Sequence, residues 1–492
     1  MNPDSHLLHT SFVVVYLLAL IGVGAIKARK VNSQADFSLA GRGLSTFVLV
    51  GTLLATWIGT GSIFGNAEET YRVGVPAFLL PVSGALGIIA LYFLAARVRR
   101  IGQFTIQDIL EERYGVAVRV IGTVTLLLSY VIIVSYQYRA GSAVLERLMP
   151  GMGNAWAVVA VALFVILYTA LAGMFSVAYT DVANGILMAI GIAIALPILV
   201  VKAGGTGALV AALEPGGQHL FGHYSAASLI SVLLPSFLLL LGDANMYQRF
   251  FSARDPAAAR RSAAWMFAGV VLLECAIIAT ALAGASLVAQ GKVAAPENQA
   301  HIVVHLAFDV LPAFLGAMLV ATVVAVVVST ADSYLLAPST ALVRDVYQRF
   351  LRPDAPENRV VLVGRVIVVL LGLIALGLAF TSDRFFHVAL FAYTVYGAGI
   401  TPALIAAFFW KRATPAGALS SMLVGVGTSI VWKFLIANES VAIWATDRGI
   451  DGLASVVRWA VERNLDAVIP ATLVNVTVLI TVSLMSRPAS GR

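Results

Sequence analysis

Long runs of hydrophobic residues alternate with short polar segments along the whole chain. Each run holds about 20 mostly apolar residues, which is the length that an α-helix needs to cross a bilayer. The pattern predicts thirteen membrane-spanning helices, at residues 8–26, 46–67, 75–96, 117–148, 155–172, 176–201, 228–252, 262–289, 313–347, 360–380, 385–410, 415–436 and 466–485. No segment between them has the composition of a soluble domain, so residues 1–492 are expected to form a single all-α, polytopic membrane domain.

The composition supports this interpretation and excludes several functions. Of the 492 residues, 60% are hydrophobic and 12% are charged, whereas roughly 25% of the residues in a typical soluble domain are charged. This balance excludes a soluble enzyme, a nucleic-acid-binding protein and a disordered scaffold. The single cysteine, Cys275, excludes an internal disulfide and a metal site built on cysteines.

The basic residues predict the orientation of the chain in the membrane. Alternate loops, including those at 97–119 and 249–261, carry 22 of the 32 lysines and arginines, and the opposite loops carry nine. Basic loops are retained in the cytoplasm, so the N-terminus is expected outside and the C-terminus inside. The same asymmetry accounts for the net charge of +7 without a nucleic-acid partner.

Two predicted spans contain residues that interrupt a helix. The second span places glycines and hydroxyl residues together at its centre, namely Thr56, Gly59, Thr60, Gly61, Ser62 and Gly65. The seventh is interrupted by Gly242 and Asp243. Glycines of membrane helices also serve as close-packing sites, but two broken helices five spans apart are typical of an inverted-repeat secondary transporter. The expected parts are a leading helix and loop (1–45), a first repeat (46–201), a second repeat (228–410) and flanking helices (411–492).

The ninth span carries a cluster of polar residues, Ser329, Thr330, Asp332 and Ser333, after a run of valines. Hydroxyls in membrane helices often bond to carbonyls of their own helix. A carboxylate at this depth is costly unless it is paired or binds a cation, which makes it a functional candidate. Asp181, Asp243 and Arg139 are further polar residues within spans, and Glu274 lies in the middle of a span without an assigned partner.

Several segments, in this order, carry a resemblance to a known family: DFSLAGRGLSTF, ATWIGTGSIFGNAEETY, GMFSVAYTD, MYQRFFSARD and STADSYLLAPSTALVRDVY. Over about residues 35–410 the chain resembles the sodium/solute symporter family, which includes bacterial proline, galactose and sialic-acid symporters and the animal choline transporter. The resemblance implies a LeuT-like five-helix inverted repeat that imports a small organic solute with Na+ by alternating access.

The resemblance also implies a set of ion ligands. The family's sodium site falls on the backbone carbonyls of Ala55, Ile58 and Val326 and on the hydroxyls of Ser329 and Thr330. Five neutral oxygens of this kind suit a monovalent cation, by extension from the oxygen ligands of other hard cations. Some members bind a second sodium, and the matching positions form a candidate second sodium or coupling site at Asp181, Asp332 and Ser333. Asp332 departs from the serine of two-sodium members, which leaves the stoichiometry open.

The candidate solute-binding residues lie around the two helix breaks. They are Trp57, Gly59, Ser62, Tyr136, Gln137, Asp243 and Tyr247, with Arg139 and Tyr393 as secondary candidates. An indole ring beside a carboxylate favours a cationic or amine-bearing solute, and an inward-facing Arg139 would suit a zwitterion. The alternative is that Asp243 pairs with Arg139 or Arg249 and never meets the solute.

The favoured hypothesis is therefore a sodium-coupled symporter, not an enzyme, in the bacterial inner or plasma membrane, with membrane lipid and a small solute as partners. One alternative is a proton-coupled symporter of the same fold that uses Asp181, Asp332 and Asp243 as a relay. A second is a membrane solute sensor, although no signalling domain is expected before Arg492.

Overall fold

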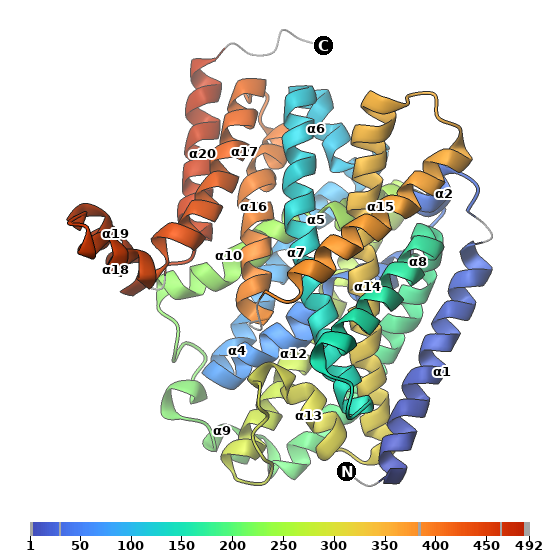
Figure 1. Cartoon of the computed structure of the whole chain (residues 1–492), viewed down its shortest axis with the longest axis vertical. Coiled ribbons are helices and arrows are strands. Elements are labelled where there is room, and N and C mark those ends of the chain that lie inside the picture. The colour runs from blue at the N-terminus through green and yellow to red at the C-terminus, as the bar shows by residue number, and fades with distance from the viewer. Residues whose placement is uncertain (1–2, 29–30, 382–384, 463–464, 487–492) are drawn as a thin grey trace. The chain divides into compact units, whose positions relative to one another are not determined.

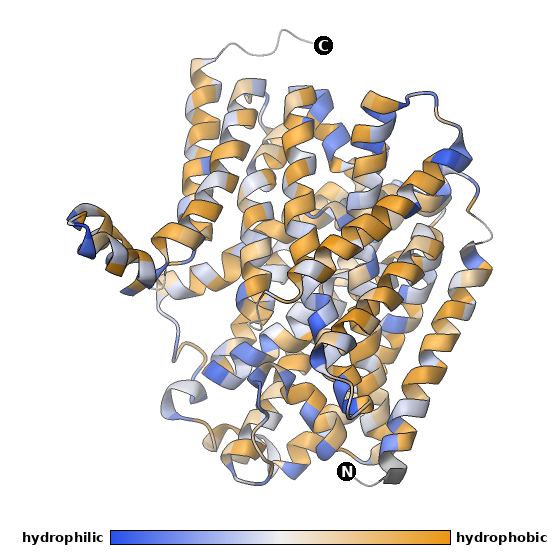
Figure 2. Cartoon of the chain, viewed as in Figure 1, coloured by the Kyte–Doolittle hydropathy of each residue, from blue (hydrophilic) through white to orange (hydrophobic). Residues whose placement is uncertain are grey.

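The structure, a computed structural model, describes residues 3–28, 31–381, 385–462 and 465–486. These residues form helices and no β-strand, which confirms the all-α prediction, and an isolated β-bridge pairs Leu44 with Ala253. Figure 2 shows that most of each long helix is hydrophobic. Six of the basic residues counted in the loops lie outside the described residues: Arg29, Lys30, Arg384, Arg463, Arg487 and Arg492.

Eleven of the described helices are long and apolar enough to cross a membrane, or twelve if one bent pair is counted as a span. The spans predicted at 155–172 and 176–201 belong to one element, α8 (Asn154–Lys202), whose backbone leaves helical geometry at Gly173 with φ +63° and ψ 174°. A straight helix of 49 residues would be about 74 Å long, more than twice the thickness of the hydrocarbon core of about 30 Å. The chain turns at Gly173 because glycine tolerates this positive φ.

Contacts divide the chain into two compact units. The first unit comprises residues 1–104, 130–223 and 245–389. Its complete helices are α1 (Pro3–Ala28), α2 (Gln34–Leu39), η1 (Ala40–Arg42), α3 (Thr46–Trp57), η2 (Gly61–Gly65), α4 (Asn66–Val73), η3 (Val75–Leu79), α5 (Leu80–Ile101), α8, α9 (Gly205–Ala211), η4 (Pro215–Gln218), α12 (Pro256–Ala289), η5 (Gln299–His301), α13 (Ile302–Asp309), α14 (Ala313–Ala341), η6 (Leu342–Leu351) and α15 (Glu357–Leu378). It also holds most of α7 (Val116–Leu148) and of α11 (Ala244–Ser252).

Helix α8 is the centre of the first unit. It packs along α14 and also contacts α1, α3, α12 and α15, and Figure 1 labels α1, α8 and α14. Helix α12 packs along α5 and against α3 and α4. The residues of α14 from Ala325 to Ala341 are all buried. The polar cluster of the ninth predicted span therefore lies inside protein and not against lipid, as an intramembrane carboxylate requires.

The second unit comprises residues 105–129, 224–244 and 390–492. It contains α6 (Ile106–Tyr114), the beginning of α7, α10 (Ala226–Gly242), most of α16 (Phe385–Phe409), α17 (Pro415–Val431), η7 (Trp432–Ile436), α18 (Glu439–Asp447), α19 (Asp451–Glu462) and α20 (Val468–Met485). Helix α17 packs along α20, and the amide of Asn475 donates to the carbonyl of Ala398 at 2.6 Å. Two short helices, α18 and α19, pack on each other.

The break predicted in the second span is present. Helix α3 ends at Trp57 and the chain continues as a helix from Gly61, with an angle of 49° between the two parts. Ile58 leaves the helical region with φ −78° and ψ 83°, and Gly61–Gly65 form a π-helical turn that leads into α4. The interruption predicted in the seventh span is also present, because α10 ends at Gly242 and Asp243 adopts an extended conformation before α11.

Candidate ion and solute site

The break between α3 and η2 lies directly against α14. A Cβ atom added to Gly59 would stand 2.9 Å from both Cγ2 and Oγ1 of Thr330, closer than real Cβ contacts. Only glycine lets the backbone of the break approach the Thr330 side chain this closely. The glycine that the sequence placed at a helix break therefore also serves as a close-packing site.

Four of the five predicted sodium ligands meet at this contact. The Ser329 hydroxyl lies 3.2 Å from the carbonyl oxygen of Ala55 and 3.3 Å from that of Val326. The Thr330 hydroxyl lies 3.4 Å from the same Ala55 oxygen. The Ala55 carbonyl is accessible because it lies in the last turn of α3, where the helix supplies no further amide to bond it.

The fifth predicted ligand, Ile58, forms the end of α3 itself. Its N–H donates to the Leu54 carbonyl at 2.9 Å. Its ψ angle of 83° turns the Ile58 carbonyl away from the direction of the helix axis. Its side chain is completely buried. The structure thus places the Ile58 backbone at the break, but no contact of its carbonyl with the two hydroxyls is described.

The candidate second site contains a cation of the chain itself. The Arg249 guanidinium, fully buried, donates through Nη2 to the Ser333 hydroxyl at 2.6 Å. The same nitrogen lies 3.5 Å from Oδ2 of Asp181. Asp332 is completely buried beside Ser333, with its Oδ1 atom 3.2 Å from the Ser333 hydroxyl.

Two threonines of α3 complete this cluster: Thr52, which the sequence did not single out, and Thr56, which it named only as part of the helix break. The Thr52 hydroxyl donates to Oδ2 of Asp181 at 2.5 Å and accepts from Nε of Arg249 at 2.9 Å. The Thr56 hydroxyl lies 3.2 Å from that of Ser333. Thr52 and Thr56 are four residues apart and share one helix face, a spacing that could have indicated their common role.

The indole of Trp57 is held by a carboxylate. Its Nε1–H donates to Oε1 of Glu274 on α12 at 3.0 Å. The Ser62 hydroxyl donates to the same oxygen at 3.2 Å. The structure therefore brings two predicted solute-site residues, one on each side of the break, onto a residue to which the sequence gave no partner.

The other candidates of the first unit lie on α7 and α11. Gln137 is completely buried, and neither atom of its amide has a hydrogen-bond partner among the described residues. Tyr136 and Tyr247 are also buried. Arg139 donates through Nη1 to the carbonyl of Ala379 at 2.9 Å. A buried amide without partners is a group that can bind a polar ligand, because leaving it unsatisfied is costly.

Asp243 and Tyr393 belong to the second unit. Asp243 is completely buried at the end of α10, and the carbonyl of the preceding residue, Gly242, accepts a hydrogen bond from the Tyr396 hydroxyl at 2.9 Å. Tyr393 is half-buried on α16.

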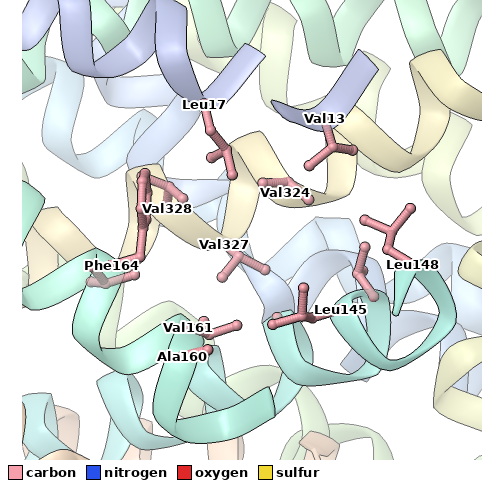
Figure 3. A pocket seen from close by; sticks show the side chains of 13 residues that line it. Val13, Leu17, Leu145, Leu148, Ala160, Val161, Phe164, Val324, Val327 and Val328 are labelled. Atoms are coloured by element: carbon pink, nitrogen blue, oxygen red, sulfur yellow. The ribbon is translucent and has the colours of Figure 1, made fainter. Parts of the chain in front are cut away.

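A cavity of about 180 Å³ in the first unit is not a candidate for either ligand. It lies among α1, α7, α8 and α14, and its wall consists of apolar side chains and one glycine. Figure 3 shows Val324, Val327 and Val328 of α14 facing into it. Because it offers no polar side chain, it cannot replace the hydration shell of an ion or of a charged solute.

Residues 37–425 match the model of the sodium:solute symporter family. The sodium/proline symporter of Escherichia coli is 27% identical over 443 residues, which cover 85% of this chain and 86% of that protein. The osmoregulated proline transporter of Bacillus subtilis is 23% identical over 434 residues, which cover 85% and 87%.

A solved structure of similar fold was also found. The substrate-bound, outward-open state of a Na+-coupled sialic acid symporter superimposes with a TM-score of 0.82 at 15% identity, covering 98% of each chain. At this identity the likeness shows the fold, which is that of the LeuT-like transporters.

Proposed function

Because the chain belongs to the sodium:solute symporter family, we propose that the oxygens between α3 and α14 bind the sodium ion that drives solute import. Sodium-coupled symport is the function of the chain, and its family and fold are those of multi-pass membrane transporters and not of enzymes. The proposal concerns where the ion binds, which solute follows it and how many ions move in each cycle.

The observation that carries the proposal is the meeting of Ser329 and Thr330 with the Ala55 carbonyl at a helix break. Free carbonyls inside a membrane are tolerated where they line a cavity or coordinate an ion. The Ala55, Ile58 and Val326 carbonyls and the two hydroxyls would supply five neutral oxygens. These ligands come from residues 46–201 and 228–410, the two proposed inverted repeats, so the ion binds well only when the repeats are in one arrangement. That difference in affinity is what couples ion binding to alternating access.

One sodium per cycle is proposed. The cluster of Asp181, Asp332 and Ser333 was the candidate second site, but the Arg249 guanidinium donates to Ser333 and lies beside Asp181. A sodium ion at Ser333 and Asp181 would lie beside this positive charge, which already compensates Asp181 and leaves only Asp332 without a cation. Arg249 thus takes the place of a second sodium.

The solute is proposed to bind at the same helix break. Trp57, Gly59 and Ser62 flank the interruption, and Tyr136, Gln137 and Tyr247 supply further buried groups, with Arg139 as a secondary candidate. Asp243 remains a candidate, and Tyr393 a secondary one, within the second unit. The free amide of Gln137 suits a solute with a polar group. One relative is named as a sodium/proline symporter and another as a proline transporter, which favours a small amine-bearing or zwitterionic solute.

The proposed arrangement in the membrane follows from the helices and the charges. Counting the two parts of α8 separately, and the bent pair as one span, gives the thirteen predicted crossings. By the positive-inside rule, the basic loops favour an N-terminus outside and a C-terminus in the cytoplasm. For a bacterial chain the proposed location is the inner membrane.

Uptake into proteoliposomes of the purified full chain tests the function. Radiolabelled L-proline should accumulate when an inward sodium gradient is applied at equal pH on both sides, and should not when potassium replaces sodium. Accumulation driven equally well by a pH gradient without sodium would favour the proton-coupled alternative. Sodium binding without transport of any small solute would favour the sensor.

A further inference from the structure

Glu274 is a carboxylate buried in the middle of a membrane helix. It lies near the centre of α12, a helix of 34 residues, and 5% of its surface is exposed. An ionised side chain at this depth is costly unless a cation or several hydrogen bonds compensate it. A buried carboxylate of this kind requires a partner of opposite charge.

The described residues supply donors to Glu274 but no cation. The indole N–H of Trp57 and the hydroxyl of Ser62 donate to Oε1, at 3.0 and 3.2 Å. Within the described ranges, no hydrogen bond reaches Oε2, and no lysine, arginine or histidine forms an ion pair with this carboxylate. Asp181, by comparison, has Arg249 beside it.

The position of Glu274 links this unmatched charge to the solute site. Its two donors lie on opposite sides of the break, Trp57 at the end of α3 and Ser62 in η2. The Trp57 ring is half-buried, so part of its surface is accessible. Gly84 of α5 lies beside the ring, where an added Cβ would stand 3.3 Å from the indole nitrogen. The hydrogen bond to Glu274 therefore fixes the orientation of a partly open aromatic face.

We propose that Glu274 binds the positively charged nitrogen of the transported solute through its free oxygen, with the ring of Trp57 against the same cation. This inference rests on the proposed function and names the chemical class of the solute. Carboxylates and indole faces both attract nitrogen cations. The solute is then a primary, secondary or quaternary amine and not a neutral sugar or a simple anion.

Sodium fits this position less well than a nitrogen cation. A sodium ion needs several oxygen ligands, whereas Trp57 presents an N–H and can only donate. A protonated amine needs one or two acceptors with correct geometry, and Oε2 supplies the first. The five oxygens around Ser329 and Thr330 remain the better sodium site.

Binding to the purified full chain tests the inference. Thermal stabilisation is measured in sodium chloride with each of the twenty amino acids, choline, glycine betaine and D-galactose. A matched pair, L-proline and tetrahydrofuran-2-carboxylate, differs in whether the ring holds a nitrogen or an oxygen atom. We expect stabilisation by at least one nitrogen cation, and none by D-galactose or by the oxygen analogue.

The variant Glu274→Gln keeps the size and the hydrogen-bond acceptor but removes the charge. It should weaken binding of the stabilising solute about tenfold or more, because one partner of a buried charge pair is lost. Cys275→Ser, at the next position of the same helix, should bind as the wild type does. Stabilisation by sodium alone should be equal in all three chains, and its absence from the wild-type chain would count against the sodium site and not against Glu274.

Three results would overturn the inference. They are an unchanged affinity in Glu274→Gln, equal binding of the oxygen analogue, and a wild-type chain that responds to sodium but to none of the nitrogen cations. Because the matched ligand pair is measured on the wild-type chain, the test does not depend on whether Glu274→Gln folds.

Discussion

The Nη2 atom of Arg249 lies 2.6 Å from the Ser333 hydroxyl, in the candidate second sodium or coupling site. The Nε atom of the same guanidinium donates to the Thr52 hydroxyl, and its Nη2 atom lies 3.5 Å from Oδ2 of Asp181. The carboxylate of Asp181 thus has an internal counter-ion that does not leave during transport. For this reason the activation of uptake by sodium should follow a Hill coefficient near 1.

Removing the Arg249 charge should destabilise the protein severely. Arg249→Gln leaves Asp181 buried without a counter-ion, and breaking a buried pair in this way costs about 3–5 kcal/mol. The double variant Arg249→Gln with Asp181→Asn should recover much of this loss. Thermal unfolding of the purified variants measures both effects. A single variant as stable as the wild type would contradict the pairing.

Ser329→Ala and Thr330→Ala should weaken sodium activation more than they lower protein abundance. Each removes one oxygen from the proposed ion site, at a cost of about 1–3 kcal/mol, or roughly 5-fold to 150-fold in sodium affinity. Sodium titration of solute uptake is the measurement. Thr322→Ala is the control, because Thr322 lies on the same helix but donates to the carbonyls of Leu187 and Met318. Unchanged sodium dependence in the double variant would mean that the two hydroxyls bond only to backbone carbonyls and do not bind sodium.

Gly59→Ala should impair sodium binding although it removes no ligand. The new methyl group would stand 2.9 Å from Thr330 and would displace its hydroxyl. We expect weaker sodium-dependent stabilisation, whereas Gly185→Ala, where the nearest atom lies at 3.7 Å, should behave as the wild type. A normal sodium response in Gly59→Ala would show that the break can move away from α14 at little cost.

His301 should make stability depend on pH in the acidic range. It packs edge-on against Phe64 and Phe385, and burial, with Arg139 and Arg147 nearby, lowers its pKa to about 4. Between the unfolded pKa of about 6.5 and the folded value, only the unfolded chain takes up the proton. The stability therefore falls as the pH decreases through this range, by up to about 3 kcal/mol.

The unfolding temperature at pH values from 7.5 to 4.5 measures this effect. The decrease should be smaller in His301→Gln than in the wild type. The exposed His219 provides the control, since His219→Gln should keep the full decrease. Parallel curves for His301→Gln and the wild type would contradict the assignment.

Labelling of single cysteines should report the orientation of the loops. In a chain with Cys275→Ser, Arg254→Cys should resist an impermeant thiol reagent added to intact cells, and His219→Cys should react. Both positions are exposed, whereas Ser252 in the same loop is fully buried and would not report. Ready labelling at position 254 from outside would overturn the predicted topology.

The sequence predicted the helices and both breaks because their signals are local. A run of about 20 apolar residues indicates a membrane-spanning helix. The glycines and hydroxyl residues at 56–65, and Gly242 before Asp243, indicate a helix break within a few residues. The turn at Gly173 was placed between two spans for the same reason. Its exact form, a single glycine with positive φ, depends on a backbone angle, and the hydropathy pattern gives no information on backbone angles.

The partners of the buried charges could not be predicted in this way. Thr52, Asp181, Arg249 and Ser333 are separated by 68 to 197 residues in their mutual hydrogen bonds. Glu274 is 217 residues from Trp57. Each of these residues is far from its partners in the sequence, and only the packing of α3, α8, α11, α12 and α14 shows which ones meet. The resemblance to a family supplied the candidate sodium ligands but contained nothing about Glu274.

The four-helix cluster around Arg249 also bears on how the protein is made. Asp181 enters the membrane long before residue 333 has been synthesised, so the nascent chain must hold Asp181, and then Arg249, before Ser333 of α14 is available. Each such charge costs about 2.5–3.5 kcal/mol during insertion by the translocon. The leucine- and alanine-rich stretches around Asp181 and before Arg249 must supply enough hydrophobic free energy to offset this cost. Variants that weaken those stretches should then fail during biogenesis, with less protein inserted, although every ligand of the finished transporter is intact.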